Sequence, residues 1–222
     1  MKRVFNLLVV DESGSMEIIR KQALVGINET LETIRKIHKT HSELEQRVTL
    51  ITFDSTHKKL FYDNVLADDA RSLSMRDYRP CGGTPLYDAI GMGIAKINAQ
   101  AAEGDNVLVT IVTDGEENCS EEYSLRMIKN LIEKLKKQGW TFTFIGTDNL
   151  DVETMAVDMG IDNHLTFQED EEGTKKMFAR ENFSRVRYSA CLAKGVEMPE
   201  GGYFDKKITP KKAKNSRMML LF

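Results

Sequence analysis

The chain has 222 residues, of which 41% are hydrophobic and 29% are charged, and its formal net charge is −3. A chain of this size and composition can bury a full hydrophobic core, so we expect one domain with a small appendage and exclude disorder as a whole. The small net charge, with no basic patch interleaved with aromatic residues before residue 170, argues against a nucleic-acid partner.

The first apolar run is short. It begins at residue 4, is interrupted by Asn6 and ends at Asp11, so it suits neither the core of a signal peptide nor a membrane span. The cysteines are odd in number and have no CxxC spacing, which is typical of reduced thiols rather than of a disulfide framework or a zinc site. These cysteines are Cys81, Cys119 and Cys191. We therefore expect a cytoplasmic protein without a membrane span.

Apolar stretches alternate with amphipathic helical patterns along the chain. Strands are predicted at 4–10, 47–53, 58–65, 106–113, 140–145 and 164–167. Helices are predicted at about 23–39, 86–101, 125–135, 152–159 and 173–192. The stretch 106–113 is almost continuously apolar, as expected for a central parallel strand, whereas the turn at 54–56 makes 58–65 an antiparallel edge strand. The polarity of 180–188 leaves the buried face of the last helix unassigned.

This alternation over about 165 residues predicts an α/β fold. We expect a doubly wound, mostly parallel sheet with one antiparallel edge strand and helices on both faces, which is a Rossmann-like arrangement. The domain should comprise 1–194, with a core at 3–168 and a C-terminal helix, followed by a basic tail at 195–222. The segment 206–222 has six basic residues and no acidic one, and it ends in MMLLF. It is expected to lie outside the main domain, as a solvated extension or a docking segment.

A polar turn follows the first predicted strand. Asp11, Ser13 and Ser15 offer a carboxylate and two hydroxyls on one short turn, and Gly14 lets that turn close. In an open parallel sheet, ligands bind beyond the carboxyl ends of the strands, which is where this turn lies. The side chains are hard oxygen donors, so the turn predicts a divalent-cation site. A helix N-cap is the alternative, although it would use only one of the three side chains.

Two further segments bring oxygen atoms to the same edge of the sheet. Asp114 follows the strand at 106–113, and Thr84 lies directly before Pro85, which is expected at the first position of a helix. Because the carboxyl ends of parallel strands meet at one edge, we expect Asp114 and Thr84 to lie beside Asp11. The predicted metal ligands are Asp11, Ser13, Ser15, Thr84 and Asp114.

The motifs that carry these residues resemble those of the von Willebrand factor A (VWA) domain. They read DESGS at 11–15, GGTPLYD at 82–88 and TDGEEN at 113–118, and the resemblance covers about residues 3–168. In that family the motifs form the metal-ion-dependent adhesion site (MIDAS). The resemblance implies an intracellular bacterial protein with an intact MIDAS and with Mg²⁺ or Mn²⁺ as its cofactor.

The resemblance also implies a role for each ligand. Ser13 and Ser15 match hydroxyls that bind the ion directly, and Thr84 matches a threonine that binds it directly or through water. Asp11 and Asp114 match aspartates that act mostly through water. An Asp or Glu of a partner protein would complete the metal shell, because the domain alone leaves the ion short of ligands. The implied function is metal-dependent protein binding, within a multi-protein assembly whose other members do the chemistry.

The alternative is an enzyme, a metal-dependent phosphohydrolase of the Rossmann-like type with Asp11 as its nucleophile. Ser13 stands where such an enzyme would carry a second carboxylate as its general acid, and the chain has no GxxxxGK[ST] phosphate-binding loop. No Ser-His-Asp or Cys-His arrangement is indicated either. We therefore expect a protein that is not an enzyme, and we leave its oligomeric state open.

Residues close to the predicted ligands have structural interpretations. Glu12 is expected to be an exposed acidic side chain. Asp88, one turn after Thr84, is expected to favour the start of a helix and to order the loop before it, with indirect support of the metal site as the alternative. Cys81 is expected to be an inert loop cysteine. The histidines show no ligand spacing and are expected to be ordinary surface or core residues: His38, His41, His57 and His164.

Overall fold

The computed structural model describes residues 2–198 and 202–204, and within them six strands form one sheet in the order β3-β2-β1-β4-β5-β6. The strands are β1 (Lys2–Asp11), β2 (Leu44–Phe53), β3 (Lys58–Leu66), β4 (Asn106–Thr113), β5 (Thr141–Thr147) and β6 (Asn163–Phe167). Of the strands in the described residues, only β3 runs antiparallel to its neighbour, and it lies at the edge of the sheet. The predicted fold, a mostly parallel α/β sheet with one antiparallel edge strand, is confirmed.

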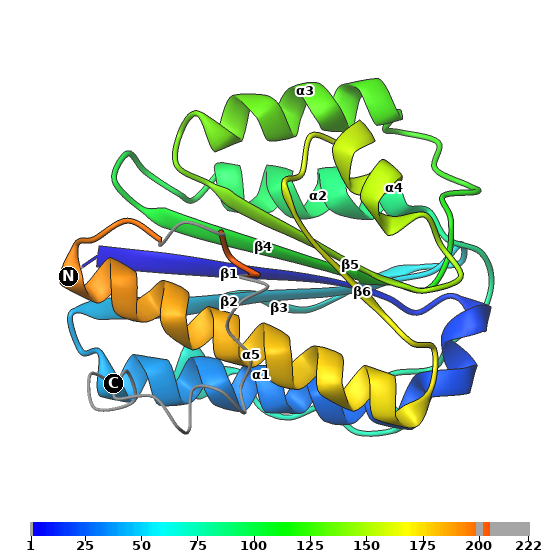
Figure 1. The fold of residues 1–222 in the computed structure, drawn as a ribbon, viewed down its shortest axis with the longest axis horizontal. Helices are drawn as coiled ribbons and strands as arrows, with labels where there is room; N and C mark the ends of the chain where they lie inside the picture. The colour runs from blue at the N-terminus through cyan, green and yellow to red at the C-terminus, as the bar shows by residue number, and fades with distance from the viewer. Residues whose placement is uncertain (1, 199–201, 205–222) are drawn as a thin grey trace.

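Helices cover both faces of the sheet (Figure 1). They are α1 (Arg20–Thr40), α2 (Leu86–Asn98), α3 (Leu125–Lys136), α4 (Val152–Asp158) and α5 (Glu171–Lys194). Alternate residues of β1 serve the two layers, because successive side chains of a strand point to opposite faces. Leu7 and Val9 pack with α2, α3 and α4, whereas Leu8 and Val10 pack with α1 and α5. The central strands are therefore buried on both sides, which explains their continuous apolar runs.

Two helix starts differ from the prediction. The turn after Asp11 continues into a 3₁₀-helical segment, Gly14–Ile19, which buries Met16 and Ile19 before α1 begins. Pro85 precedes the first helical residue of α2 instead of occupying it, since its ψ of 64° is not helical. Both differences lie at the sheet edge, where the chain bends to reach the next element.

Polar residues of α5 are buried, which is why its apolar periodicity could not be read from the sequence. Glu181 and Arg185 lie on the buried side of α5, with exposed fractions of 1% and 0%. Two residues from the segment predicted as a tail, Tyr203 and Phe204, are also buried. The packed part of the chain therefore extends past the predicted domain end at 194, and the segment 206–222 lies outside the described residues. No helix within 2–198 and 202–204 is long and apolar enough to cross a membrane.

Candidate metal site at the sheet edge

The predicted ligands lie on three segments at one edge of the sheet. Asp11 ends β1 and Asp114 directly follows β4, and these strands are parallel neighbours in which Val10 pairs with Val112. Their carboxyl ends therefore meet, as expected for a ligand site in an open sheet. We call the five predicted ligands the sheet-edge cluster: Asp11, Ser13, Ser15, Thr84 and Asp114.

Direct hydrogen bonds join four members of the sheet-edge cluster. The backbone N–H of Ser13 donates to Asp11 Oδ1 at 2.7 Å, and the hydroxyls of Ser13 and Ser15 lie 3.2 Å apart. The Ser15 hydroxyl then donates to Asp114 Oδ1 at 2.7 Å. One polar network thus connects the end of β1 to the end of β4.

Thr84, the fifth member, reaches the cluster through a close approach to Gly115. A Cβ atom at Gly115 would lie only 2.8 Å from the Thr84 Oγ1 atom, so a larger residue there would displace the threonine. Asn118 fixes the Thr84 backbone from the same side. Its Oδ1 atom accepts from Thr84 N at 2.9 Å, and its own N–H donates to the Thr84 carbonyl at 3.2 Å. Hydrogen bonds therefore join four of the predicted ligands, and Thr84 lies beside Gly115, the residue after Asp114.

Two buried hydroxyls that the sequence analysis did not single out hold Asp11 in place. The Thr113 hydroxyl donates to Asp11 Oδ2 and the Tyr78 hydroxyl donates to the Asp11 carbonyl oxygen, both at 2.6 Å. Thr113 carries a recognisable signal, because it directly precedes Asp114 at the end of an apolar strand. Tyr78 carries none, since it lies in a polar loop far from β1 in the sequence.

The two carboxylates of the sheet-edge cluster are buried, and no cationic side chain of the described residues compensates their charge. Asp11 and Asp114 have exposed fractions of 0% and 2%, and neither forms an ion pair within the described part of the chain. Burial raises the pKa of Asp11 to about 6 and that of Asp114 to about 7. Asp114 Oδ2 is moreover buried with no hydrogen-bond partner among the described residues. Hard oxygen donors with a deficit of positive charge suit a divalent cation.

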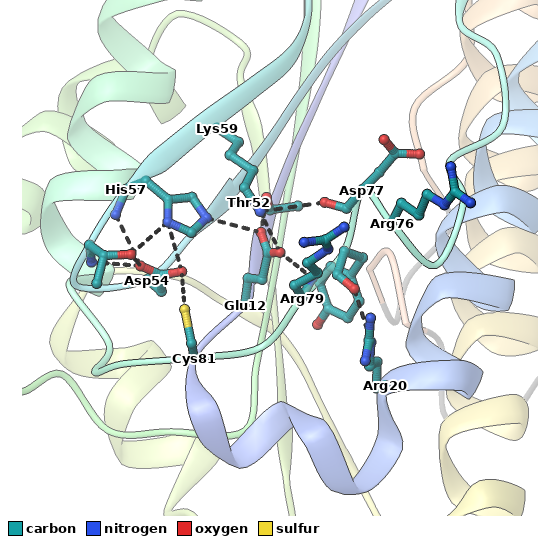
Figure 2. Close-up of polar contacts among 12 residues, drawn as sticks. Glu12, Arg20, Thr52, Asp54, His57, Lys59, Arg76, Asp77, Arg79 and Cys81 are labelled. Atoms are coloured by element: carbon teal, nitrogen blue, oxygen red, sulfur yellow. Dashed lines mark hydrogen bonds and ion pairs between the residues drawn. The ribbon is translucent and has the colours of Figure 1, made fainter.

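Glu12 corrects an expectation. It was predicted to be exposed, but its exposed fraction is 0% and it lies between His57 and Lys59 (Figure 2). Lys59 Nζ donates to Glu12 Oε1 at 2.7 Å, and the Thr52 hydroxyl donates to Oε2 at 2.5 Å. Thr52 lies on β2 and Lys59 lies on the edge strand β3, so the buried carboxylate has both a hydrogen-bond donor and a positive charge beside it.

Asp88 stabilises the loop that carries Asn118. It accepts backbone hydrogen bonds from Glu121, Glu122 and Tyr123 at 3.1, 2.9 and 2.8 Å. Burial opposes ionisation of Asp88, but these bonds outweigh it and hold the pKa of the carboxyl below its usual value. Its contacts are therefore structural, as expected, although they fix the loop after β4 rather than the one before α2.

A second group of ligand-type side chains lies beside the sheet-edge cluster, where none was expected. Asp54, His57 and Cys81 have ligand atoms within 4.8 Å of one another. Sequence spacing could not reveal this group, because Asp54 and His57 belong to the turn between β2 and β3, whereas Cys81 belongs to a separate loop.

Comparison with protein families identifies the fold. The model of the von Willebrand factor type A domain matches residues 7–180. The chain belongs to the VWA family. VWA domains are often metal-dependent protein-interaction modules, and the sheet-edge cluster of this VWA domain lies within the matched residues. No curated protein sequence matches the chain.

Solved structures share the VWA fold at low sequence identity. The PilB minor pilin from Streptococcus sanguinis has a TM-score of 0.58 and 15% identity, over 83% of this chain and 61% of PilB. The pilus adhesin SpaC from Lactobacillus rhamnosus GG has a TM-score of 0.64 and 14% identity, over 84% of this chain and 31% of SpaC. The VWA domain of SpRpn10 has a TM-score of 0.55 and 10% identity, over 82% of this chain and 94% of that domain. This chain spans less than two thirds of either pilus protein, and the likeness concerns the fold alone.

Proposed function

We propose that this VWA domain is a metal-dependent protein-binding module. The sheet-edge cluster serves as its MIDAS, where the five side chains hold Mg²⁺ or Mn²⁺ and an Asp or Glu of a partner protein completes the shell. The observation that carries the proposal is a pair of buried carboxylates, Asp11 and Asp114, that have no cationic side chain as a partner among the described residues. One oxygen of Asp114 also has no hydrogen-bond partner among these residues. A bound cation supplies the missing positive charge.

The distribution of charge supports recognition of an acidic partner. Ser13, Ser15 and Thr84 are neutral ligands, so only Asp11 and Asp114 offset the charge of the ion. Ser15 is exposed, and it marks the side from which a partner reaches the site. A carboxylate that arrives there makes a short, charge-assisted contact, which fixes orientation even where the surrounding interface is small.

The contacts of Asp11 support binding over catalysis. Its Oδ1 atom accepts from the Ser13 N–H and its Oδ2 atom accepts from the Thr113 hydroxyl. A carboxylate with both oxygens held in this way is poorly placed to attack a phosphate, and Ser13 supplies no general acid. We therefore assign no catalytic role to the domain and place it in a multi-protein assembly.

The setting of that assembly is part of the proposal. All three cysteines are free, which fits the reducing cytoplasm of a bacterium. The names of PilB and SpaC describe a minor pilin and a pilus adhesin, and at 15% and 14% identity they transfer no location to this chain.

Calorimetry tests the metal site first. Wild type should bind one Mg²⁺ or Mn²⁺, and an Asp11→Ala/Asp114→Ala double variant should lose binding while it stays folded, because both residues lie at the sheet edge outside the apolar core. Asp63→Ala is the matched control, since Asp63 is an acidic residue of β3 that pairs with Lys96 far from the cluster. Equal binding by wild type and the double variant would overturn the assignment.

Partner capture tests the recognition mode. A complex isolated with wild type in Mg²⁺ should dissociate in chelator and should not form with Asp11→Ala. Single replacement of the partner's Asp and Glu residues should then identify one whose loss weakens the complex about a hundredfold, as expected for a desolvated charge pair at an interface. A complex that survives chelation, or that no acidic substitution weakens, would require a metal-independent surface.

A further inference from the structure

The second ligand group connects two loops that are distant in sequence. His57 Nδ1 lies 3.1 Å from Asp54 Oδ2, and the Cys81 thiol donates to the same oxygen at 3.2 Å. Figure 2 shows the imidazole of His57 and the sulfur of Cys81 turned toward the Asp54 carboxylate. Asp54 is buried, His57 is partly buried and Cys81 is exposed, so the group lies at the surface with one open side.

We propose that Asp54 Oδ2, His57 Nδ1 and Cys81 Sγ form a second metal site, which takes Zn²⁺ and is separate from the sheet-edge cluster. One sulfur, one imidazole nitrogen and one carboxylate oxygen are the donors that Zn²⁺ accepts, whereas Mg²⁺ selects oxygen alone. Zinc bonds of about 2.0 to 2.3 Å in a tetrahedron separate the ligand atoms by roughly 3.3 to 3.7 Å. The ligand atoms already lie within 4.8 Å of one another, so small side-chain rotations suffice.

The surroundings of the ligands support the site. Asp54 Oδ1 is occupied by the backbone N–H groups of Thr56 at 2.6 Å and of His57 at 3.0 Å, which leaves Oδ2 for the ion. His57 Nε2 is buried and has no hydrogen-bond partner in the described part of the chain, and it lies 3.7 Å from Glu12 Oε2. The second nitrogen of a histidine that binds zinc usually donates to a carboxylate, and Glu12 lies on that side of the ring, although 3.7 Å is too long for a hydrogen bond.

A structural turn and a redox-active thiol are weaker interpretations of the group. The contacts of Asp54 Oδ1, with Thr56 Oγ1 at 2.7 Å from His57 Nδ1, form an ordinary turn, but they do not account for Cys81, which comes from another loop. Hydrogen bonding to Asp54 raises the pKa of the Cys81 thiol, whereas reactive cysteines have lowered values. A cation instead replaces the thiol proton, which is released as the sulfur becomes a ligand.

A metal ion at this site would hold the loop that carries Thr84 against the turn between β2 and β3. Gly82, next to Cys81, has a φ of +67°, and a Cβ there would collide with Ser55 Oγ. The same Ser55 hydroxyl accepts from Gly83 N at 2.8 Å. The loop thus already contacts the turn between β2 and β3. An ion bound by both Asp54 and Cys81 would add a second connection between the loop and the turn. The exposed side leaves a fourth position for water.

Titration of the reduced, metal-free full chain with Co²⁺ tests the proposal. A thiolate bound to Co²⁺ gives a charge-transfer band in the near ultraviolet, and the sheet-edge cluster contains no sulfur that could produce it. Wild type should show this band, excess Zn²⁺ should remove it, and excess Mg²⁺ should leave it. Cys81→Ser should abolish the band, and His57→Gln should weaken Co²⁺ binding at least about tenfold.

Matched variants separate this site from the proposed MIDAS. Cys119→Ser and Cys191→Ser should keep the band, since neither thiol belongs to the group. Asp11→Ala/Asp114→Ala should also keep it, so a failure of the proposed function would not affect the result. A urea unfolding transition like that of wild type would show that Cys81→Ser is folded, whether or not the sheet-edge cluster binds Mg²⁺. Absence of the band in wild type, or a band that Cys81→Ser leaves unchanged, would overturn the proposal.

Discussion

Two buried polar clusters of this VWA domain differ in how their charges are balanced. In the sheet-edge cluster, Asp11 and Asp114 have no cationic side chain as a partner among the described residues, and burial raises the pKa of both. The second, which we call the α5 cluster, joins β1 and β4 to the last helix. Its members are Asn6, Thr110, Glu181, Arg185 and Tyr203, all with exposed fractions of 3% or less.

The α5 cluster is complete without a ligand. Arg185 Nη2 donates to Glu181 Oε1 at 2.6 Å and to Thr110 Oγ1 at 2.8 Å, and Nη1 donates to Asn6 Oδ1 at 2.5 Å. The Tyr203 hydroxyl adds a bond of 3.0 Å to Glu181. Similar burial therefore has opposite consequences. In a balanced cluster each buried charge has its partner, whereas an unbalanced cluster costs stability and retains the capacity to bind a cation.

The largest expected effect comes from unbalancing the α5 cluster. Arg185→Met should lower the free energy of unfolding by about 3 to 5 kcal/mol, because Glu181 would remain buried without its partner. Urea unfolding measures the loss. A double variant, Arg185→Met/Glu181→Leu, should recover most of it, since no buried charge is then left. A loss below about 1 kcal/mol in Arg185→Met would show that the ion pair is not the stabilising element.

Removing a carboxylate from the sheet-edge cluster should weaken metal binding without lowering the stability of the metal-free protein. Asp114→Ala should weaken Mg²⁺ binding roughly a hundredfold, about 2.7 kcal/mol, while metal-free stability stays equal or rises because an uncompensated buried charge is gone. Calorimetry and urea unfolding of the same preparation provide both numbers. A large loss of metal-free stability would place Asp114 with the structural cluster instead.

The fold was readable from the sequence because its signals are local. Continuous apolar runs predicted β1 and β4, and the polar turn after β2 predicted the antiparallel edge. The buried face of α5 was not readable, because it is formed by Glu181 and Arg185, which resemble surface residues until their partners on the sheet are known.

The candidate site was partly readable for the same reason. Asp11 and Asp114 end two strands, so their meeting follows from parallel pairing, although metal binding by the cluster stays a prediction. Glu12 was assigned wrongly, since its burial depends on Lys59 from the edge strand. The proximity of His57 to Cys81 depends on how two loops pack, and no periodicity reports that.

The pH dependence of stability should reveal the unbalanced charges. The pKa values of Asp11 and Asp114 are raised from 3.8 to about 6 and about 7, so the native state holds these protons after the unfolded chain has lost them. Metal-free stability should therefore fall as the pH rises from about 4 to about 7.5, by at most about 1.4 kcal/mol per pH unit for each of the two carboxyls. Carboxyls with lowered pKa values, such as Asp88, change stability mainly below that window.

Difference measurements isolate this contribution. Urea unfolding of wild type should be compared at each pH with an Asp11→Asn/Asp114→Asn variant, whose profile should be flat by comparison. Saturating Mg²⁺ should reverse the wild-type slope, because the cation binds the ionised form and competes with protons. Parallel profiles for the two proteins would mean that these carboxyls titrate normally.

The smallest expected effect comes from Asp88, which shares features with both clusters. Asp88 is buried and well satisfied like the α5 cluster, yet its three backbone contacts fix the loop that carries Asn118, which in turn holds Thr84. Asp88→Asn should lower the free energy of unfolding by about 1 kcal/mol, because an amide presents fewer acceptors to the same N–H groups. It should also weaken Mg²⁺ binding only two- to threefold, about 0.5 kcal/mol, since Thr84 is displaced indirectly.

Asp63→Asn, in the exposed pair with Lys96, should change neither quantity. A loss of affinity as large as that in Asp114→Ala would place Asp88 among the ligands, and no loss at all would separate the loop from the site.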